Sequence, residues 1–198
     1  LLEYANPLVK VTIVPRGRAL GAAWYLPEER QITTREQMLD EMCATLAGRA
    51  AEQLCTGHIS SGAMNDLERV TKQAYGMIAY MGMGEGLQNI CYYNTDEYSF
   101  HRPYSETTAQ LIDEDVKKMI AEQYDRACQI LSEHREQHAL LAERLVEREV
   151  VFAEDVEEIF GPRPWTSRTE ELLAADEKKQ ETEDAPENND KNIESEEV

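Results

Sequence analysis

The stretch "SSGAMNDLERVTKQA", residues 60–74, marks the point at which a loop becomes a helix. Two serines and a glycine favour a loop, and the residues that follow predict a helix that begins near Ala63. Asp66 falls in the first turn of that helix, where the helix dipole favours a carboxylate. From these residues alone, Asp66 is explained as a residue that stabilises a helix end, although a carboxylate is also an ordinary zinc ligand.

Helical periodicity extends in both directions from this stretch. On the N-terminal side, Thr33 or Thr34 can cap a helix that reaches about Leu54. On the C-terminal side, the second helix is expected to end at the glycines of "MGMGEG", residues 81–86. The apolar residues that we expect on the inner side of the first helix are Met38, Leu39, Met42, Leu46 and Ala50.

The C-terminal half of the chain is also helical in pattern. From Ser105 to about Glu147, the periodicity predicts one long amphipathic helix or two nearly collinear ones. The stretch before it, residues 87–106, is irregular and aromatic, and we expect a loop with room for a short strand. "VFAEDVEEIFG", residues 151–161, predicts a last short helix that ends at its glycine. The apolar stripe of the long helical region consists of Ile112, Val116, Ile120, Ala127, Leu131, Leu141 and Leu145.

The N-terminal stretch "LVKVTIVPRGRALGAAWYLPEE", residues 8–29, has the pattern of a β-hairpin. Val9, Val11 and Ile13 alternate with two polar residues, which is the period of a half-buried strand. Pro15 and Gly17 favour the turn that follows. We therefore predict a mainly α fold with a small β-hairpin or sheet near the N-terminus.

Charge and composition exclude several classes of protein. The 198 residues include 20 basic and 39 acidic side chains, a net charge of −19. Such a chain is repelled by phosphate backbones, so we expect no nucleic-acid partner. Residues 166–198 hold twelve acidic and four basic side chains and no aromatic one, which predicts a disordered acidic tail after a domain of residues 1–165.

The cysteines and the start of the chain give two further expectations. Cys43, Cys55, Cys91 and Cys128 are scattered singly, which favours buried thiols in a reducing compartment over a disulfide or zinc framework. The chain opens with "LLEYANPLVKV" and has no initiator methionine. We expect a piece of a longer protein that begins inside a structural element.

"HREQH", residues 134–138, places two histidines four positions apart, as on a metal-binding helix. The zinc protease pattern H-E-x-x-H has its glutamate directly after the first histidine. Glu136 lies roughly 200° round the helix from His134, so it cannot overhang a metal held by this pair. We therefore expect His134 and His138 to be half-buried structural residues, and His58 and His101 to be solvated in loops.

Four stretches together resemble one family of enzymes. They are "KVTIVPRGRALG" (10–21), "LAGRAAEQL" (46–54), "SSGAMNDLERVTKQA" (60–74) and "MIAYMGMGEG" (77–86). Their order and spacing are similar to those in the peptidase domain of the FtsH-type ATP-dependent zinc metalloproteases. The resemblance runs from about Leu1 to Pro162 and fades in the acidic tail.

This resemblance implies a zincin-type peptidase domain that works as a homohexamer beneath a ring of ATPase domains. The enzyme would hydrolyse unfolded or membrane proteins at an inner membrane, on its cytoplasmic side. The anchor, the ATP-binding domain and the H-E-x-x-H helix would lie upstream of this chain. No catalytic residue is then expected within the 198 residues, and the chain alone is expected to be inactive.

Two sites within the chain follow from the same resemblance. The family's third zinc ligand corresponds to Asp66, and the neighbouring Asn65 is expected to shape the turn. An extended substrate lies beside an edge strand in zincin-type sites, which suggests substrate binding at Val11, Thr12 and Ile13. The position of His138 is commonly an apolar core residue in relatives, which agrees with its structural interpretation. The alternative is a non-catalytic helical oligomerisation module derived from such a protease.

Overall fold

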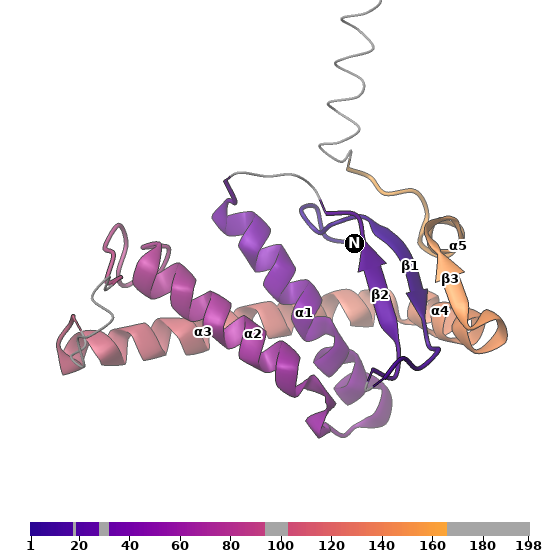
Figure 1. The fold of residues 1–198 in the computed structure, drawn as a ribbon, viewed down its shortest axis with the longest axis horizontal. Helices are drawn as coiled ribbons and strands as arrows, with labels where there is room; N and C mark the ends of the chain where they lie inside the picture. Colours follow the sequence, from indigo (N-terminus) through magenta and orange to yellow (C-terminus); the bar gives the residue numbers. More distant parts are fainter. Residues whose placement is uncertain (18, 28–31, 94–102, 166–198) are drawn as a thin grey trace, which may run out of the picture. The chain divides into compact units, whose positions relative to one another are not determined.

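The computed structural model describes residues 1–17, 19–27, 32–93 and 103–165, and it is mainly helical with one small sheet (Figure 1). Residues Leu1–Arg163 form one unit and Pro164–Val198 another. The acidic segment 166–198 lies outside the described residues, so its disorder stays a prediction. None of the described helices combines the length and the apolar character that crossing a membrane requires.

The first helix, α1 (Arg35–Thr56), begins and ends at the expected signals. Thr34 caps it: the Thr34 hydroxyl accepts from the Gln37 N–H at 3.4 Å, and the Gln37 side chain accepts from the Thr34 N–H at 2.8 Å. Gly57 ends it in the left-handed conformation, at φ 72°, which a glycine adopts without steric cost. The predicted helix and its cap are confirmed.

The second helical segment is made of three successive forms of helix. A short 3₁₀ turn, η1 (Ser61–Ala63), leads into α2 (Met64–Tyr75), and α2 continues as a π-helical turn, η2 (Gly76–Tyr80). The predicted start near Ala63 is therefore correct to within one residue.

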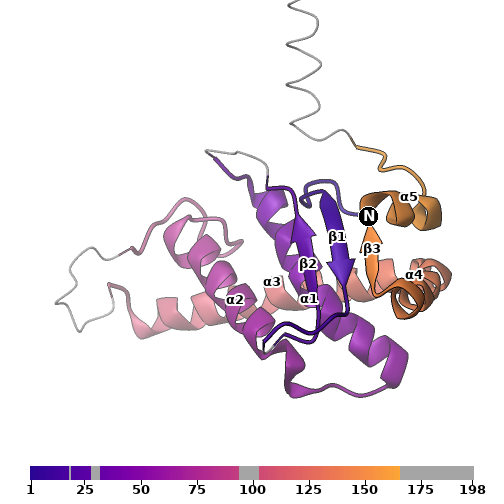
Figure 2. The same ribbon diagram turned by 45° about the vertical axis from the view of Figure 1, so that its right-hand side comes forward.

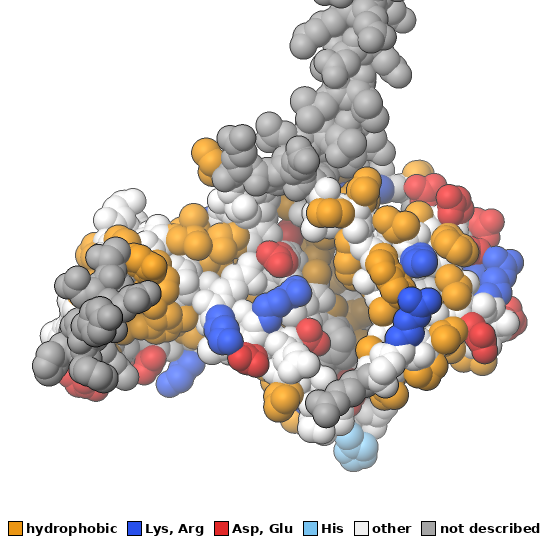
Figure 3. All heavy atoms as spheres, viewed as in Figure 1, with side chains coloured by type: hydrophobic (Ala, Val, Ile, Leu, Met, Phe, Trp, Pro, Cys, Tyr) orange, Lys and Arg blue, Asp and Glu red, His pale blue; other side chains and the backbone are white. Residues whose placement is uncertain are grey.

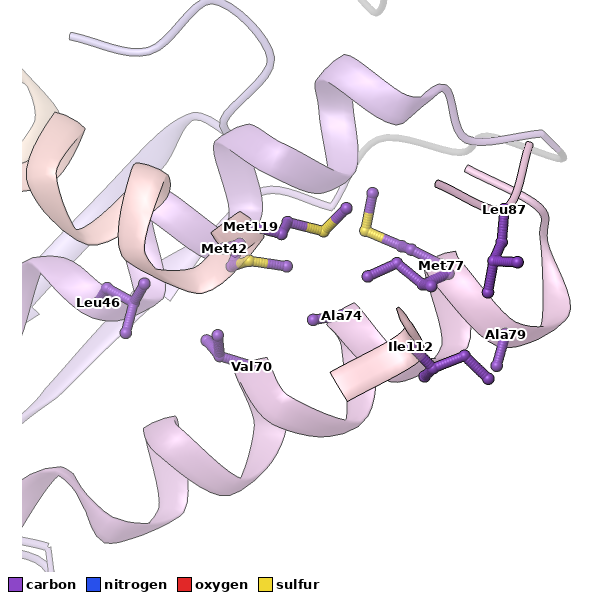
Figure 4. Packing of buried hydrophobic residues seen from close by; sticks show 10 residues of the cluster. Met42, Leu46, Val70, Ala74, Met77, Ala79, Leu87, Ile112 and Met119 are labelled. Atoms are coloured by element: carbon purple, nitrogen blue, oxygen red, sulfur yellow. The ribbon is translucent and has the colours of Figure 1, made fainter. Parts of the chain in front are cut away.

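The hydrophobic core lies between α1, α2, η2 and α3 (Glu106–Glu133). Figure 4 shows Met42, Met77 and Met119 converging from three of these elements. Methionine fills irregular gaps well because its side chain is unbranched and flexible. The buried members of this cluster are Met42, Leu46, Val70, Ala74, Met77, Ile78, Ala79, Leu87, Ile112 and Met119.

The long helical region is two helices rather than one. α3 ends at His134, whose backbone leaves the helical conformation at φ −111° and ψ 31°, and α4 (Arg135–Arg148) follows. α4 ends at Glu149, at φ 60°, and the chain turns directly into a strand. This break decides between the two possibilities that the periodicity left open.

The sheet has three antiparallel strands in the order β2-β1-β3. β1 (Leu8–Thr12) and β2 (Ala22–Tyr25) form the predicted hairpin, and β3 (Val150–Phe152) pairs with the other side of β1. β3 leads into α5 (Ala153–Phe160). The prediction of a helix from residue 151 was wrong at its start, because a three-residue strand whose partner lies far away in sequence leaves no local pattern.

The burial of β1 also differs from the prediction. Thr12 is 7% exposed, whereas Val9 and Ile13 are 43% and 41% exposed. The Thr12 hydroxyl donates to the Glu149 carbonyl at 2.8 Å and accepts from the Val14 N–H at 3.1 Å, so its burial leaves no polar group unpaired. A register shift between Leu8 and Lys10 further disturbs simple alternation along the strand.

The burial of the cysteines is only partly as expected. Cys43 is buried and Cys128 half-buried, but Cys55 and Cys91 are exposed, so the expectation of four buried thiols was wrong for these two. All four are free thiols. In the irregular stretch 87–106, residues 94–102 lie outside the described residues, and an isolated bridge joins Met83 to Gln88.

Figures 1 and 2 show how the two kinds of element are arranged. In both views, β2 is the strand nearest α1 and α2, and β3 lies on the other side of β1, beside α4 and α5. The N-terminal end of α2 lies at the end of the molecule where β1 finishes and β2 begins. β3 packs on α4 and α5 and β1 packs on α5, while α1, α2 and α3 pack on one another.

Candidate metal centre

Asp66 is the third residue of α2 and is exposed to solvent. No hydrogen bond or ion pair joins its carboxylate to another residue in the described part of the chain, and the N-terminus of α2 has no side-chain cap. A carboxylate whose purpose is to cap the helix would accept a backbone N–H there. Apart from the helix dipole, the structure therefore gives Asp66 no local partner, and its oxygens are accessible to a ligand.

The loop that precedes Asp66 is held by side chains on both sides. The hydroxyl of Thr56, at the end of α1, accepts from the His58 N–H at 3.2 Å. Ser60 caps the 3₁₀ turn through its hydroxyl, which accepts from the Gly62 N–H at 3.2 Å. These local bonds fix the direction in which α2 begins.

Glu52 adds a longer-range bond to this loop. Its carboxylate, on α1, accepts from the Ser60 N–H at 3.0 Å and lies 3.7 Å from the Arg49 guanidinium. Hydrogen bonding by the side chain and backbone of Ser60, assisted by Arg49, lowers the pKa of Glu52 below its ordinary value. Glu52 was missed in the sequence, although a carboxylate in the last turns of α1, before the C-cap Gly57, is placed to reach the loop after that cap.

The surface around Asp66 is apolar as well as acidic. Ile59, Met64 and Leu67 are all exposed on the loop and on the first turn of α2. Figure 3 shows, farther along, a hollow with hydrophobic side chains between the part formed by the helices and the part formed by the strands.

Val11, Thr12 and Ile13 lie at the middle of the sheet rather than at its edge. Val11 pairs with Ala23 on one side and Val151 on the other, and the Ile13 N–H donates to the Glu149 carbonyl at 3.1 Å. The expectation that β1 is an edge strand was therefore wrong: β3 occupies the side that a substrate would need. The free edge nearest α1 and α2 belongs to β2.

The two histidines of the 134–138 stretch do not form a metal centre with the described residues. Both are half-buried, as predicted. The His134 ring lies 6.2 Å from the Phe160 ring, and His138 Nδ1 lies 4.0 Å from Cys55 Sγ. His58 is exposed, as expected, and His101 lies outside the described residues.

The described residues supply one free carboxylate but not a complete zinc site. No three His, Cys, Asp or Glu side chains come together in the described ranges in a way that could hold a metal ion. A catalytic zinc ion needs three protein ligands and one open position. Asp66 suits the place of a single ligand, and any zinc site that includes it needs two more from outside these residues.

Comparison with known proteins relates most of the chain to one family of peptidases. A family model described as peptidase family M41 matches residues 1–159. The chain is 66% identical over 180 residues to the ATP-dependent zinc metalloprotease FtsH of Parabacteroides distasonis, covering 90% of this chain and 26% of that protein. It is 49% identical over 169 residues to the protein of the same name from Rhodothermus marinus, covering 83% of this chain and 24% of that protein.

A eukaryotic relative shows the same pattern of coverage. The mitochondrial inner membrane m-AAA protease component AFG3L1 of Mus musculus is 45% identical over 170 residues, which are 85% of this chain and 22% of that protein. The chain thus spans about a quarter of the length of the curated relatives it matches.

Proposed function

Because the chain belongs to peptidase family M41, we propose that it is the peptidase portion of an ATP-dependent zinc metalloprotease, and that Asp66 is one of its zinc ligands. The observation that carries this proposal is the exposed Asp66 carboxylate, which has no described protein partner although the loop before it is held by several hydrogen bonds. Metal ligands need such a fixed backbone, because a ligand that must be ordered on binding weakens the site.

Zinc, when bound, would supply Lewis acidity and a water molecule whose pKa is lowered to about 7. The role of this chain is to hold the zinc ion and to align the substrate. Asp66 supplies negative charge from the first turn of α2, and the other two ligands would come from residues outside the described part of the chain, in a segment with the H-E-x-x-H pattern. The hollow between helices and strands, with its apolar lining, offers surface against which such a segment could pack.

The substrate would lie in an extended conformation along the free edge of β2. Backbone pairing at a strand edge accepts almost any sequence, which suits an enzyme for unfolded proteins. Val11 and Thr12 would then act from the neighbouring strand, by holding β2 in register through the pairs Val11–Ala23 and Thr12–Ala22, and Ile13 by anchoring the end of β1 to the Glu149 carbonyl. This is a revised role for the three residues, since their own backbone groups are paired.

The wider assembly is proposed from the relatives. An ATPase domain that binds ATP and unfolds substrates, a membrane anchor and a homohexameric arrangement would be supplied by parts of the complete protein outside this chain. The name of the Parabacteroides distasonis relative supports an ATP-dependent enzyme that uses zinc. The name of the Mus musculus relative refers to an inner membrane, which supports the proposed anchor.

A non-catalytic assembly module is the second candidate. It would need the same helical core but no zinc. Asp66 would then serve only to stabilise the dipole of α2, and the hydrogen bonds that fix the loop before it would have no further purpose, which favours the enzyme.

Replacing Asp66 tests the proposal directly. In the complete protein, Asp66→Asn keeps the size of the side chain and removes the anionic ligand. We expect loss of bound zinc and of zinc-dependent cleavage of an unfolded polypeptide, with ATP hydrolysis retained. Glu36→Gln is the matched control, because Glu36 is an exposed acidic residue in the first turn of α1.

The two candidates give different results in this experiment. Full zinc content and normal cleavage in Asp66→Asn would remove Asp66 from the site. A wild-type protein that neither binds zinc nor cleaves, with or without a chelator, would establish the assembly module instead.

A further inference from the structure

Asp40, on α1, is a buried carboxylate with two partners from different parts of the chain. It is 3% exposed. One oxygen lies 2.7 Å from the Arg126 guanidinium of α3, and the other accepts from the backbone N–H of Tyr4 at 2.9 Å. A buried charge is stable only when it is paired and hydrogen-bonded, so both partners are needed to keep Asp40 where it is.

Arg163 holds the same N-terminal segment from the other end of the sequence. One of its guanidinium nitrogens donates to the carbonyls of Glu3 and Ala5, each at 2.8 Å. Three successive residues, Glu3–Ala5, thus have a backbone group bonded to a charged side chain. We call Asp40, Arg126 and Arg163 the N-terminal clamp.

The segment held by the clamp runs directly into the sheet. Two residues after Ala5, the Pro7 carbonyl accepts from the Leu26 N–H at 2.8 Å, just beyond the end of β2. Fixing residues 3–5 therefore fixes the end of the sheet at which β1 starts and β2 finishes. Asp40 ties this end to α1 and, through Arg126, to α3.

Such a link matters because β3 packs on α4 and α5 and β1 on α5, and no strand makes comparably extensive contact with α1, α2 or α3 in the described residues. Figure 3 shows the hollow that separates the strands from the helices over part of the surface. Where apolar packing between two layers is sparse, charge-assisted hydrogen bonds set their relative position, since they require a defined geometry.

We propose that Asp40 and Arg163 are positioning residues of the peptidase site: they hold the end of the sheet opposite the N-terminus of α2, and so set the direction in which the free edge of β2 runs toward Asp66. The inference rests on the proposed function. A merely structural role is the alternative: the Asp40–Arg126 pair would then only join α1 to α3. The two roles predict different effects on catalysis and on local opening.

The experiment uses Asp40→Asn and Arg163→Gln in the complete, zinc-loaded protein, with cleavage of an unfolded polypeptide measured well below the unfolding temperature. Neither variant changes a residue of β2, so substrate should still pair with the edge in the closed state and KM should change little. The scissile bond of the substrate should be misplaced relative to the zinc site. The value of kcat should then fall on the order of tenfold or more, because small displacements of reacting groups have large effects on rate. Zinc content should stay at the wild-type level.

Hydrogen exchange followed by mass spectrometry gives a readout that does not depend on activity. We expect faster exchange in residues 1–12 and in β2 of both variants, with α1, α2 and α3 still protected. Asp155→Asn is the matched control: Asp155 pairs with Arg144 and Arg148 between α4 and α5, at similar distances, and makes no bond to residues 3–5. It should leave kcat, KM and the exchange of residues 1–7, the segment that the clamp holds, unchanged.

Each contrary outcome has a distinct meaning. Unchanged kcat in both variants, or faster exchange confined to α1 and α3, would overturn the positioning role and leave Asp40 as a helix-packing residue. A wild-type protein without zinc-dependent cleavage would defeat the proposed function, and the positioning of a peptidase site with it. Exchange would then still tell whether the clamp holds the sheet in place.

Discussion

The helical region of α1, α2 and α3 and the sheet region of β1 to β3, α4 and α5 are stabilised by different interactions. In the helical region, methionine, leucine, isoleucine and alanine side chains are almost fully buried against one another. In the sheet region, α4 and α5 have no buried residue at all, and ion pairs join them. The first region depends on apolar area removed from water, and the second on the geometry of polar groups.

The largest effect should come from the helical region. Ile112 is 1% exposed within the core of α1, α2 and α3. Ile112→Ala removes buried methyl and methylene groups and leaves a cavity, which should lower the free energy of unfolding by about 2–5 kcal/mol. Urea denaturation followed by circular dichroism measures this change.

Leu141→Ala in α4 is the matching change in the sheet region. Leu141 is only half-buried, so its truncation should have a clearly smaller effect than that of Ile112. Equal losses for the two variants would contradict the difference between the regions.

The second effect concerns a polar group of the sheet region. Thr12→Val keeps the shape of a buried side chain and removes the hydroxyl that bonds the Glu149 carbonyl and the Val14 N–H. We expect a loss of about 1–2 kcal/mol in the free energy of unfolding, since a buried hydrogen-bonding group is lost without a replacement.

Thr107→Val serves as its control, because Thr107 is exposed on α3. A fully stable Thr12→Val variant would show that apolar contacts, and not these bonds, hold β1 to the turn after α4.

The same difference explains what could be predicted from the sequence. The helix from Thr34 to about Leu54 was found because capping and apolar periodicity are local signals. β3 was missed because its pairing depends on β1, about 140 residues earlier in the chain. The break at His134 was left open for a related reason, since the periodicity on both sides of it is helical.

The candidate site was predictable only through the family resemblance. The residues around Asp66 suggest a helix start, and nothing local separates a ligand from a residue that stabilises the helix dipole. Glu52 and Asp40 were not identified at all, because their importance comes from bonds to Ser60 and Tyr4 that exist only in the folded chain. Polar contacts between distant residues leave no periodic pattern.

The third prediction is a dependence on pH in the sheet region. Hydrogen bonding from the Phe152 N–H, with the charges of Arg148 and Arg144, lowers the pKa of Asp155 below its ordinary value of 3.8. The stability that Asp155 contributes is therefore complete above that value and is lost as the pH falls through the lowered pKa of the folded state. Asp155→Asn should melt below the wild type at pH 6.

The two melting temperatures should converge as the pH falls below the ordinary value of 3.8, where the aspartate becomes protonated as well. Thermal denaturation of both proteins at several pH values measures this convergence. A constant gap down to the lowest pH would mean that Asp155 acts through packing and not through its charge.

The smallest effect should come from an ion pair on the surface of the helical region. Lys72 Nζ lies 2.5 Å from the Glu68 carboxylate, one turn apart on α2, and the two side chains are 75% and 59% exposed. Water and salt screen such a pair, and holding two long side chains in one geometry has an entropic cost that offsets the attraction. Glu68→Gln should therefore leave the melting temperature unchanged within error at moderate salt. Asp155→Asn, measured beside it, should lower that temperature, because its carboxylate is 14% exposed and accepts a backbone N–H as well as two arginines. If Glu68→Gln destabilised the protein as much as Asp155→Asn, an exposed ion pair would stabilise the protein as much as a mostly buried one. The burial of an ion pair would then not explain which pairs stabilise this protein.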